Sequence, residues 1–133
     1  MTETTSENAW PGKISAITLF AEDLDATKRF YREVFGMPVT YENENSAVFD
    51  FGNTIINLLR SDAAHDLIGP ARVAGPEAGS RLQLTLPVED VDAMCEVLAA
   101  RGVTLLNGPM DRPWGIRTAS FVDPSGHVWE IAR

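Results

Sequence analysis

The sequence predicts an α+β fold built from two copies of a βαβββ module. Residues 22–26 read EDLDA and residues 89–93 read EDVDA, so a near-identical segment recurs 67 residues later, about half of the 133-residue chain. A strand-like run precedes each copy, and a helical run that stops at a glycine follows it. Similar segments at such a spacing indicate a duplicated structural unit.

The first module is expected to open with a strand in ISAITLFA, followed by Asp23 as the N-cap of a helix. That helix runs through TKRFYREVFGM and ends at Gly36, as helices commonly end at a glycine. One stripe of it should be buried, at Leu24, Thr27, Tyr31 and Val34. Three short strands then follow within MPVTYENEN, SAVFDFG and NTIINLLR, with turns at Asn43-Glu44-Asn45 and Gly52-Asn53.

The second module repeats this order. A strand in LQLTLPV precedes Asp90 as the N-cap, and the helix in MCEVLAARGV stops at Gly102. Its buried stripe is expected near Val91, Met94 and Leu98. The closing strands lie within VTLLNGPM, IRTASFV and HVWEIAR, and the last two are joined by a β-turn at DPSG.

The domain organisation follows from these elements. The first nine residues, MTETTSENA, are polar and aperiodic, so residues 1–10 are predicted to form a flexible tail before a single domain at 11–133. Within it, module one spans 13–60 and module two spans 81–133. The segment 61–80 between them is rich in Gly, Ala and Pro, and a connection of that length indicates a functional flap or a mobile linker.

The bulk composition excludes some functions. The net charge is −8, which argues against nucleic acid as a partner because phosphate binding needs clustered Lys and Arg. No apolar run is long enough to cross a membrane, so no membrane partner is expected. Cys95 is the only cysteine; we interpret it as a buried, unreactive thiol and expect a cytoplasmic protein.

The strand–Asp–helix unit LFAEDLDATKRFYREVFGM and the closing hairpin SFVDPSGHVWEIAR resemble the glyoxalase/bleomycin resistance protein/dioxygenase superfamily, also called the vicinal oxygen chelate superfamily. The hairpin is similar to the frequent family ending F-x-D-P-x-G-x-x-x-E-hydrophobic, and the resemblance spans about residues 13–133. It implies that the modules form a curved, partly closed mixed sheet around a cleft, with the helices outside. It also implies a homodimer, because relatives of this length often complete the cleft by exchanging modules.

In metal-dependent relatives, four ligands point into the cleft, from the first and last strands of each module. Counting about seven residues back from Asp23 and Asp90, and taking the matching last-strand positions, gives Ala16, Asn57, Gln83 and Glu130. In the family, these positions usually hold His, Glu or Gln, His and Glu. Here only the last of them, Glu130, keeps the usual residue. Alanine cannot ligate, and neutral amide oxygens bind transition metals weakly. We therefore expect no metal and no other cofactor.

Neither histidine is expected to restore such a site. His65 lies in the linker, and the odd spacing of His127 from Glu130 places it on the opposite face of the last strand. Strand alternation also identifies the side chains that face the cleft. Leu82, Leu84, Leu86 and Val88 form a row that faces the helix, so Arg81, Gln83 and Thr85 face the other way. The same reasoning adds Ile14, Ala16, Thr18, Phe20, Asn57, Val128, Glu130 and Ala132.

Glu130 and Trp114 each admit two interpretations. Glu130 acts as a general base or holds a cationic ligand group, or it pairs with Arg81 as a satisfied structural carboxylate. Trp114, in the loop RPWGIR, covers the cleft mouth and stacks on a planar ligand, or it packs over its own hairpin. The ligand-binding candidates are Thr18, Phe20, Asn57, Arg81, Gln83, Thr85 and Trp114, with Glu130 as the catalytic candidate.

The sequence leaves three functions open. The first is a metal-free protein that binds a small organic molecule, such as an antibiotic or another planar ligand. The second is a lyase, isomerase or dioxygenase-type enzyme of the same superfamily that uses Glu130, with or without a divalent metal. The third is a protein with a vestigial cleft that acts through its dimer surface. Fold alone does not choose among them.

Overall fold

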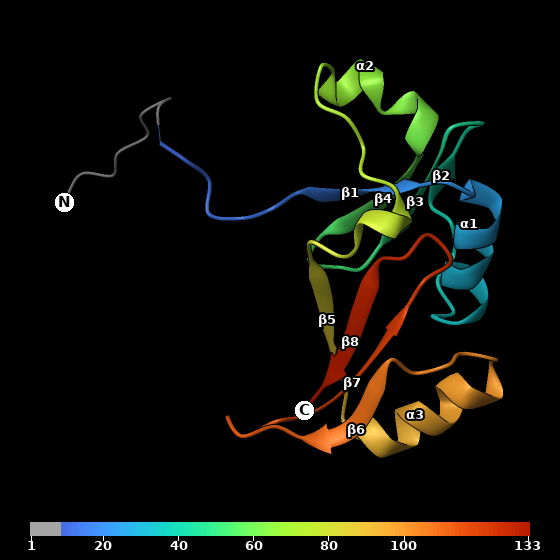
Figure 1. The fold of residues 1–133 in the computed structure, drawn as a ribbon. Coiled ribbons are helices and arrows are strands. Elements are labelled where there is room, and N and C mark those ends of the chain that lie inside the picture. The colour runs from blue at the N-terminus through green and yellow to red at the C-terminus, as the bar shows by residue number, and fades with distance from the viewer. Residues whose placement is uncertain (1–8) are drawn as a thin grey trace.

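The computed structural model describes residues 9–133. The predicted flexible tail at 1–10 therefore falls mostly outside the described residues, which include only its last two positions. Of these, Trp10 is 93% exposed. The chain beyond it enters the first strand of a domain with two parts, one above the other in Figure 1.

Module one is a four-stranded mixed sheet covered by a helix. Its strand order is β1-β4-β3-β2, with β1 and β4 parallel and the other neighbours antiparallel. The elements are β1 Ala16–Ala21, α1 Leu24–Glu33, β2 Tyr41–Glu42, β3 Ser46–Asp50 and β4 Ile55–Arg60. Each falls within the sequence run that predicted it.

Module two repeats the arrangement, with order β5-β8-β7-β6 and a parallel β5–β8 pair. Its elements are β5 Gln83–Pro87, α3 Val91–Ala100, β6 Asn107–Asp111, β7 Arg117–Val122 and β8 Val128–Ala132. The fold is thus α+β with two βαβββ modules, as predicted. Within residues 9–133, strands pair only inside their own module, so the two mixed sheets are separate and do not close into a barrel.

The connection between the modules is not structureless. It contains a 3-10 turn at Ser61–Ala63, the short helix α2 at His65–Ile68, and a second 3-10 turn at Pro76–Ala78. Most of its side chains are exposed, although Ala64 is 1% exposed. In Figure 1 it passes from the end of β4 across the front of module one to the start of β5.

The two long helices begin and end as the sequence predicts. The Asp23 carboxylate accepts a hydrogen bond from the Ala26 amide at 3.0 Å, and the Asp90 carboxylate accepts one from Ala93 at 3.0 Å. Beyond the helices, Gly36 has φ 69° and Gly102 has φ 84°, a conformation that glycine adopts without steric cost. These caps fix where each helix starts relative to the strand before it.

The buried stripes are confirmed with one exception. Leu24, Thr27, Tyr31, Val34, Val91 and Leu98 are all buried. Met94 is 36% exposed, so its predicted burial is wrong. In this part of α3, the half-buried Cys95 packs against the core instead.

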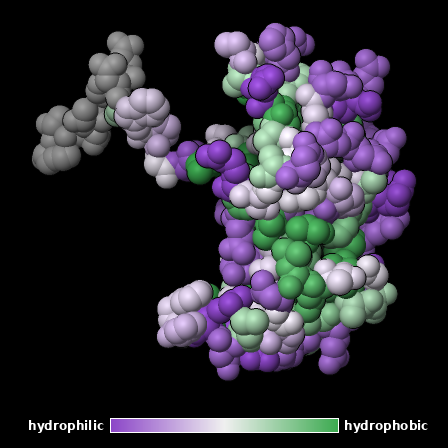
Figure 2. All heavy atoms as spheres, in the orientation of Figure 1, coloured by the Kyte–Doolittle hydropathy of each residue, from purple (hydrophilic) through white to green (hydrophobic). Residues whose placement is uncertain are grey.

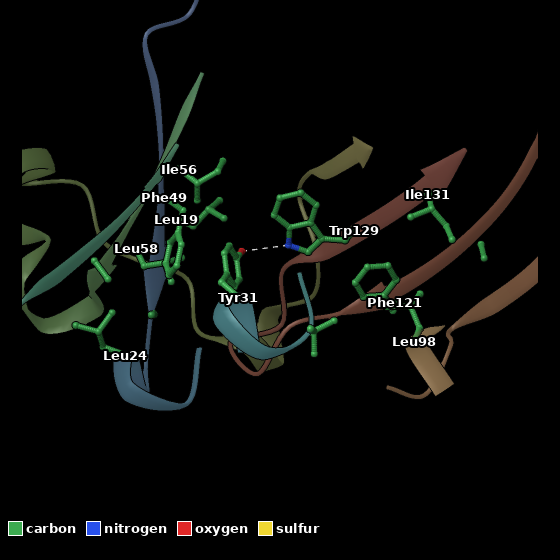
Figure 3. Packing of buried hydrophobic residues seen from close by; sticks show 14 of the residues in the cluster. Leu19, Leu24, Tyr31, Phe49, Ile56, Leu58, Leu98, Phe121, Trp129 and Ile131 are labelled. Atoms are coloured by element: carbon green, nitrogen blue, oxygen red, sulfur yellow. Dashed lines mark hydrogen bonds between the residues drawn. The ribbon is translucent and has the colours of Figure 1, made fainter. Parts of the chain in front are cut away.

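A single apolar core joins the modules, because α1 of module one packs against β8 of module two. Tyr31 and Phe35 make edge-on ring contacts with Trp129, with centroids 5.7 and 4.9 Å apart. Figure 3 shows Tyr31 pointing across the core at Trp129, whose indole N–H donates to the phenol oxygen at 3.1 Å. Trp129 is 1% exposed, as its alternation with Glu130 predicts.

The surface is mainly hydrophilic. Figure 2 shows polar residues over most of the face in view, with an apolar area at its centre where the modules meet. Among the helices in the described part of the chain, none is long and apolar enough to cross a membrane.

Candidate functional site

A cavity of about 410 Å³ lies where the end of β1, the linker and the turn before β8 come together. Three of the residues predicted to bind a ligand line it: Thr18 and Phe20 from β1, and Arg81 from the start of module two. Thr18 and Phe20 are half-buried, while their neighbour Leu19 points into the core at 2% exposure. Strand alternation therefore aims the first two side chains into the cavity.

Asn57, Gln83 and Thr85 lie within the two sheets, and a pair in module one matches a pair in module two. Thr18 pairs in register with Asn57, and Thr85 pairs in register with Glu130. The Asn57 amide donates to the Thr18 hydroxyl at 3.4 Å, and the Thr85 hydroxyl donates to the Glu130 carboxylate at 2.8 Å. Asn57 and Glu130 thus each have a threonine partner at the equivalent position of their module.

Gln83 and Glu130 belong to a polar group on the open face of the second sheet. The Gln83 amide donates to the Ser120 hydroxyl at 3.5 Å, and Ser120 is the cross-strand neighbour of Glu130. Among residues 9–133, Glu130 makes no ion pair with Arg81, so that alternative for Glu130 is not found. The hydrogen-bond partner of Glu130 is instead the Thr85 hydroxyl, and Glu130 is half-buried.

Trp114 lies at the tip of the β6–β7 hairpin and is 69% exposed. This exposure is incompatible with the alternative that Trp114 packs over its own hairpin. Trp114 does not line the cavity. In the same hairpin, the Arg112 guanidinium donates to the Thr118 hydroxyl at 2.8 Å and to the side-chain amide oxygen of Asn107 at 2.9 Å.

The four positions that correspond to family metal ligands do not fit a divalent metal. Ala16 and Asn57 lie on the first sheet, whereas Gln83 and Glu130 lie on the second. Their side chains offer one carboxylate and two neutral amides, and no imidazole or thiolate. In the part of the chain that the structure describes, no group of three or more His, Cys, Asp or Glu side chains is placed to hold a metal.

Sequence reasoning missed the contribution of His127, which lines the cavity. The prediction placed it outside the cleft because alternation was counted back from Glu130. That count does not reach His127, because β8 begins at Val128 and His127 lies between the DPSG turn and the strand. There, its Nδ1 lies 2.9 Å from a carboxylate oxygen of Asp123. Alternation applies only within a strand.

The individual linker residues that line the cavity were not predicted; the sequence indicated only that 61–80 is a functional flap or a mobile linker. Arg72, Gly75 and Pro76 contribute to the wall, close to the turn at Gly126. The only available signal was the Gly/Pro-rich composition of 61–80. Composition identifies a loop, but it cannot show which strand the loop covers.

The cavity lining is positively charged in an acidic protein. Among the described residues, its lining contains the guanidinium groups of Arg72 and Arg81 and one carboxylate, Glu22, whereas the whole chain has a net charge of −8. Elsewhere, burial raises the pKa of the Cys95 thiol, an effect to which the nearby Asp92 adds. A raised pKa lowers the fraction of reactive thiolate, which agrees with an unreactive Cys95.

The family assignment comes from comparison with known proteins. Residues 13–131 match the model of the Glyoxalase/Bleomycin resistance protein/Dioxygenase superfamily. The chain belongs to this superfamily. The vicinal oxygen chelate resemblance read from its two modules is thereby confirmed.

Two relatives are similar over most of the superfamily domain. The uncharacterized protein YraH of Bacillus subtilis is 36% identical over 123 residues, which cover 90% of this chain and 96% of that protein. A probable lactoylglutathione lyase of Vibrio cholerae is 30% identical over 115 residues, which cover 82% of this chain and 81% of that protein.

Solved structures support the same fold for this superfamily member. A glyoxalase/bleomycin resistance protein/dioxygenase from Nocardioides superposes with a TM-score of 0.84 at 24% identity, covering 95% of this chain and 85% of the other. A glyoxalase-related enzyme from Fulvimarina pelagi gives a TM-score of 0.78 at 26% identity, with coverages of 92% and 88%. The superfamily shares this architecture among proteins with different chemistry, so function rests on the site.

Proposed function

We propose that this protein binds a small organic molecule without a metal ion, in the cavity between β1, the linker and the turn before β8. The observation that carries the proposal is the cavity itself. Its volume of about 410 Å³ is within the range of small-molecule sites, and Phe20 adds an aromatic wall beside polar Thr18 and Arg81. An antibiotic or another planar compound fits such a lining.

The independence from metal is supported by donor chemistry. Alanine occupies one of the four ligand positions, and Asn57 and Gln83 contribute amides where the family uses stronger donors. The amide N–H groups of both residues donate to neighbouring hydroxyls, and the Glu130 carboxylate accepts from Thr85. These side chains form a hydrogen-bonded polar surface in each sheet.

We further propose a homodimer in the cytoplasm, with no nucleic acid or membrane partner. The Thr18–Asn57 face and the Thr85–Glu130 face lie on separate sheets, so a second copy that exchanges modules would bring such faces together. The net charge of −8 disfavours nucleic acid, and a lone cysteine suits a reducing compartment.

Ligand-observed NMR with a panel of anionic, cationic and neutral aromatic compounds tests the binding function, with EDTA present throughout. We expect saturable binding by members of the panel. Phe20→Ser should weaken it by removing the aromatic wall, whereas the exposed Tyr41→Ser serves as a matched control. No binding by any compound, or equal loss in both variants, would contradict the proposal.

A second function, a lyase or isomerase that uses Glu130, is favoured by one observation. The 30% identical relative from Vibrio cholerae is named a probable lactoylglutathione lyase. Glu130 lies at the matching last-strand position, half-buried and hydrogen-bonded to Thr85. If this function holds, Glu130→Gln should abolish turnover of a glutathione hemithioacetal while Glu96→Gln leaves it intact; equal rates for both would exclude Glu130 as the base.

A further inference from the structure

The Asp123 carboxylate fixes the orientation of the His127 imidazole. Its side chain is 0% exposed, and one oxygen accepts hydrogen bonds from the backbone amides of Ser125 at 2.9 Å and His127 at 3.0 Å. The other oxygen accepts from the Tyr31 hydroxyl at 2.9 Å and lies 2.9 Å from His127 Nδ1. A carboxylate held by so many donors binds the ring through an Nδ1–H donor.

In the neutral ring, that arrangement leaves the second ring nitrogen, Nε2, as a hydrogen-bond acceptor. The His127 side chain is 16% exposed and lines the cavity. Among the hydrogen bonds of residues 9–133, none uses Nε2. The imidazole therefore presents to the cavity an acceptor whose position is set by a buried carboxylate.

Two guanidinium groups share this cavity with His127. Arg72 and Arg81 are both exposed at its wall, and in the described structure neither forms an ion pair. Glu22 is the one carboxylate that residues 9–133 contribute to the lining. The flat, forked guanidinium group binds carboxylates through paired hydrogen bonds, so this lining favours an anion over a cation.

We propose that the cavity binds a planar organic carboxylate that also carries a hydroxyl group. Arg72 and Arg81 bind the carboxylate, Phe20 contacts the ring, and His127 Nε2 accepts a hydrogen bond from the ligand hydroxyl. This inference rests on the proposed binding function and names the ligand class. Asp123 acts as a positioning residue, because it contacts His127 rather than the ligand.

Calorimetry with four probes separates the two ligand groups: 3-hydroxybenzoate, 4-hydroxybenzoate, benzoate and phenol. We expect at least one hydroxybenzoate to bind roughly 2- to 10-fold more tightly than benzoate, as one hydrogen bond allows. Phenol should bind at least about 10-fold more weakly than that hydroxybenzoate, because it lacks the charged group. Equal affinity for benzoate and both hydroxybenzoates would overturn the role of His127.

Variants then assign the contacts. The double variant Arg72→Gln, Arg81→Gln should weaken all three carboxylates and leave phenol unchanged, whereas the exposed Arg29→Gln, on α1, is the matched control. His127→Gln should remove the preference for hydroxybenzoate over benzoate. Carboxylate binding that survives the double arginine variant would overturn the proposal.

A measurement on the unaltered protein covers the case in which His127→Gln fails to fold. The chain has only two histidines, His65 and His127, so both imidazoles can be followed by nitrogen-15 NMR. The hydroxybenzoate that binds more tightly should shift the His127 Nε2 resonance, benzoate should not, and His65 should stay unchanged. An unshifted Nε2 would contradict the inference.

The outcomes also separate this inference from the binding function. Neutral aromatic compounds that bind at Phe20 and are insensitive to the arginine and histidine variants would overturn the ligand class and leave the binding function standing. Failure of the whole aromatic panel would contradict the binding function itself.

Discussion

Asp123 connects the two modules through hydrogen bonds of a single carboxylate. Its partner Tyr31 is on α1 of module one, and its partner His127 directly follows the DPSG turn of module two. Beside it, the Thr27 and Ser125 hydroxyls are 2.7 Å apart and also join the modules. Burial, together with the adjacent Asp123 carboxylate, raises the pKa of the Tyr31 phenol above its ordinary value of 10.0.

Tyr31→Phe tests this cluster. Removing the hydroxyl takes a donor from Asp123 and an acceptor from Trp129, so the free energy of unfolding at pH 7 should fall by about 1–3 kcal/mol. Above pH 10 the unfolded chain releases the Tyr31 proton, whereas the folded protein keeps it. Rising pH therefore lowers the free energy of unfolding of the unsubstituted protein through Tyr31, an effect that the Tyr31→Phe variant lacks. Between pH 9 and pH 11 their difference should narrow by about 1.4 kcal/mol.

Urea unfolding of both proteins across this pH range is the measurement. A difference between them that stays constant with pH would show that Tyr31 does not retain its proton. The other tyrosine, Tyr41, and the lysines are present in both proteins, so their effects cancel in the comparison.

Single residues were predictable only where the signal is local. The sequence predicted the DPSG turn and the aspartate caps because their partners lie within four residues. It could not predict that Asp123 binds Tyr31, which lies 92 positions away. Nor could it place His127 in the cavity, because the turn interrupts the strand alternation on which the prediction relied.

At the scale of elements, the capped helices set the positions of the candidate site residues. Asp23→Ala and Asp90→Ala should each lower the free energy of unfolding by about 1 kcal/mol, because each removes the acceptor for a helix amide. The caps are in different modules, so their effects should add in the double variant. Glu96→Ala, on the exposed face of α3, is the control. Urea unfolding is the measurement. If the cap variants lose no more free energy of unfolding than Glu96→Ala does, Asp23 and Asp90 do not stabilise their helices as N-caps.

The element order was predictable because each strand and helix has its own periodicity and its own stop signal. The two sheets have the same register, so Asn57 and Glu130 occupy equivalent positions, each beside a threonine. The helical turns of the linker were not predicted. Their short Gly- and Pro-rich sequence has no periodicity to indicate them.

At the scale of the whole molecule, the modules share one core and their sheets remain separate. Besides the ring contacts of Trp129, the Arg101 guanidinium at the end of α3 donates to the Val34 carbonyl at the end of α1. The sequence predicted which face of each element is buried, but not which module buries it. An amphipathic pattern specifies a buried face without specifying its partner.

We propose that this superfamily member binds its ligand without a metal. Metal analysis by mass spectrometry, on protein purified without chelator, is the decisive measurement. We expect far less than one metal ion per chain, and no gain after exposure to Zn, Ni, Fe or Mn and desalting. One equivalent of such a metal, retained on desalting and lost in Glu130→Gln, would show that the protein is a metal-binding member of its superfamily.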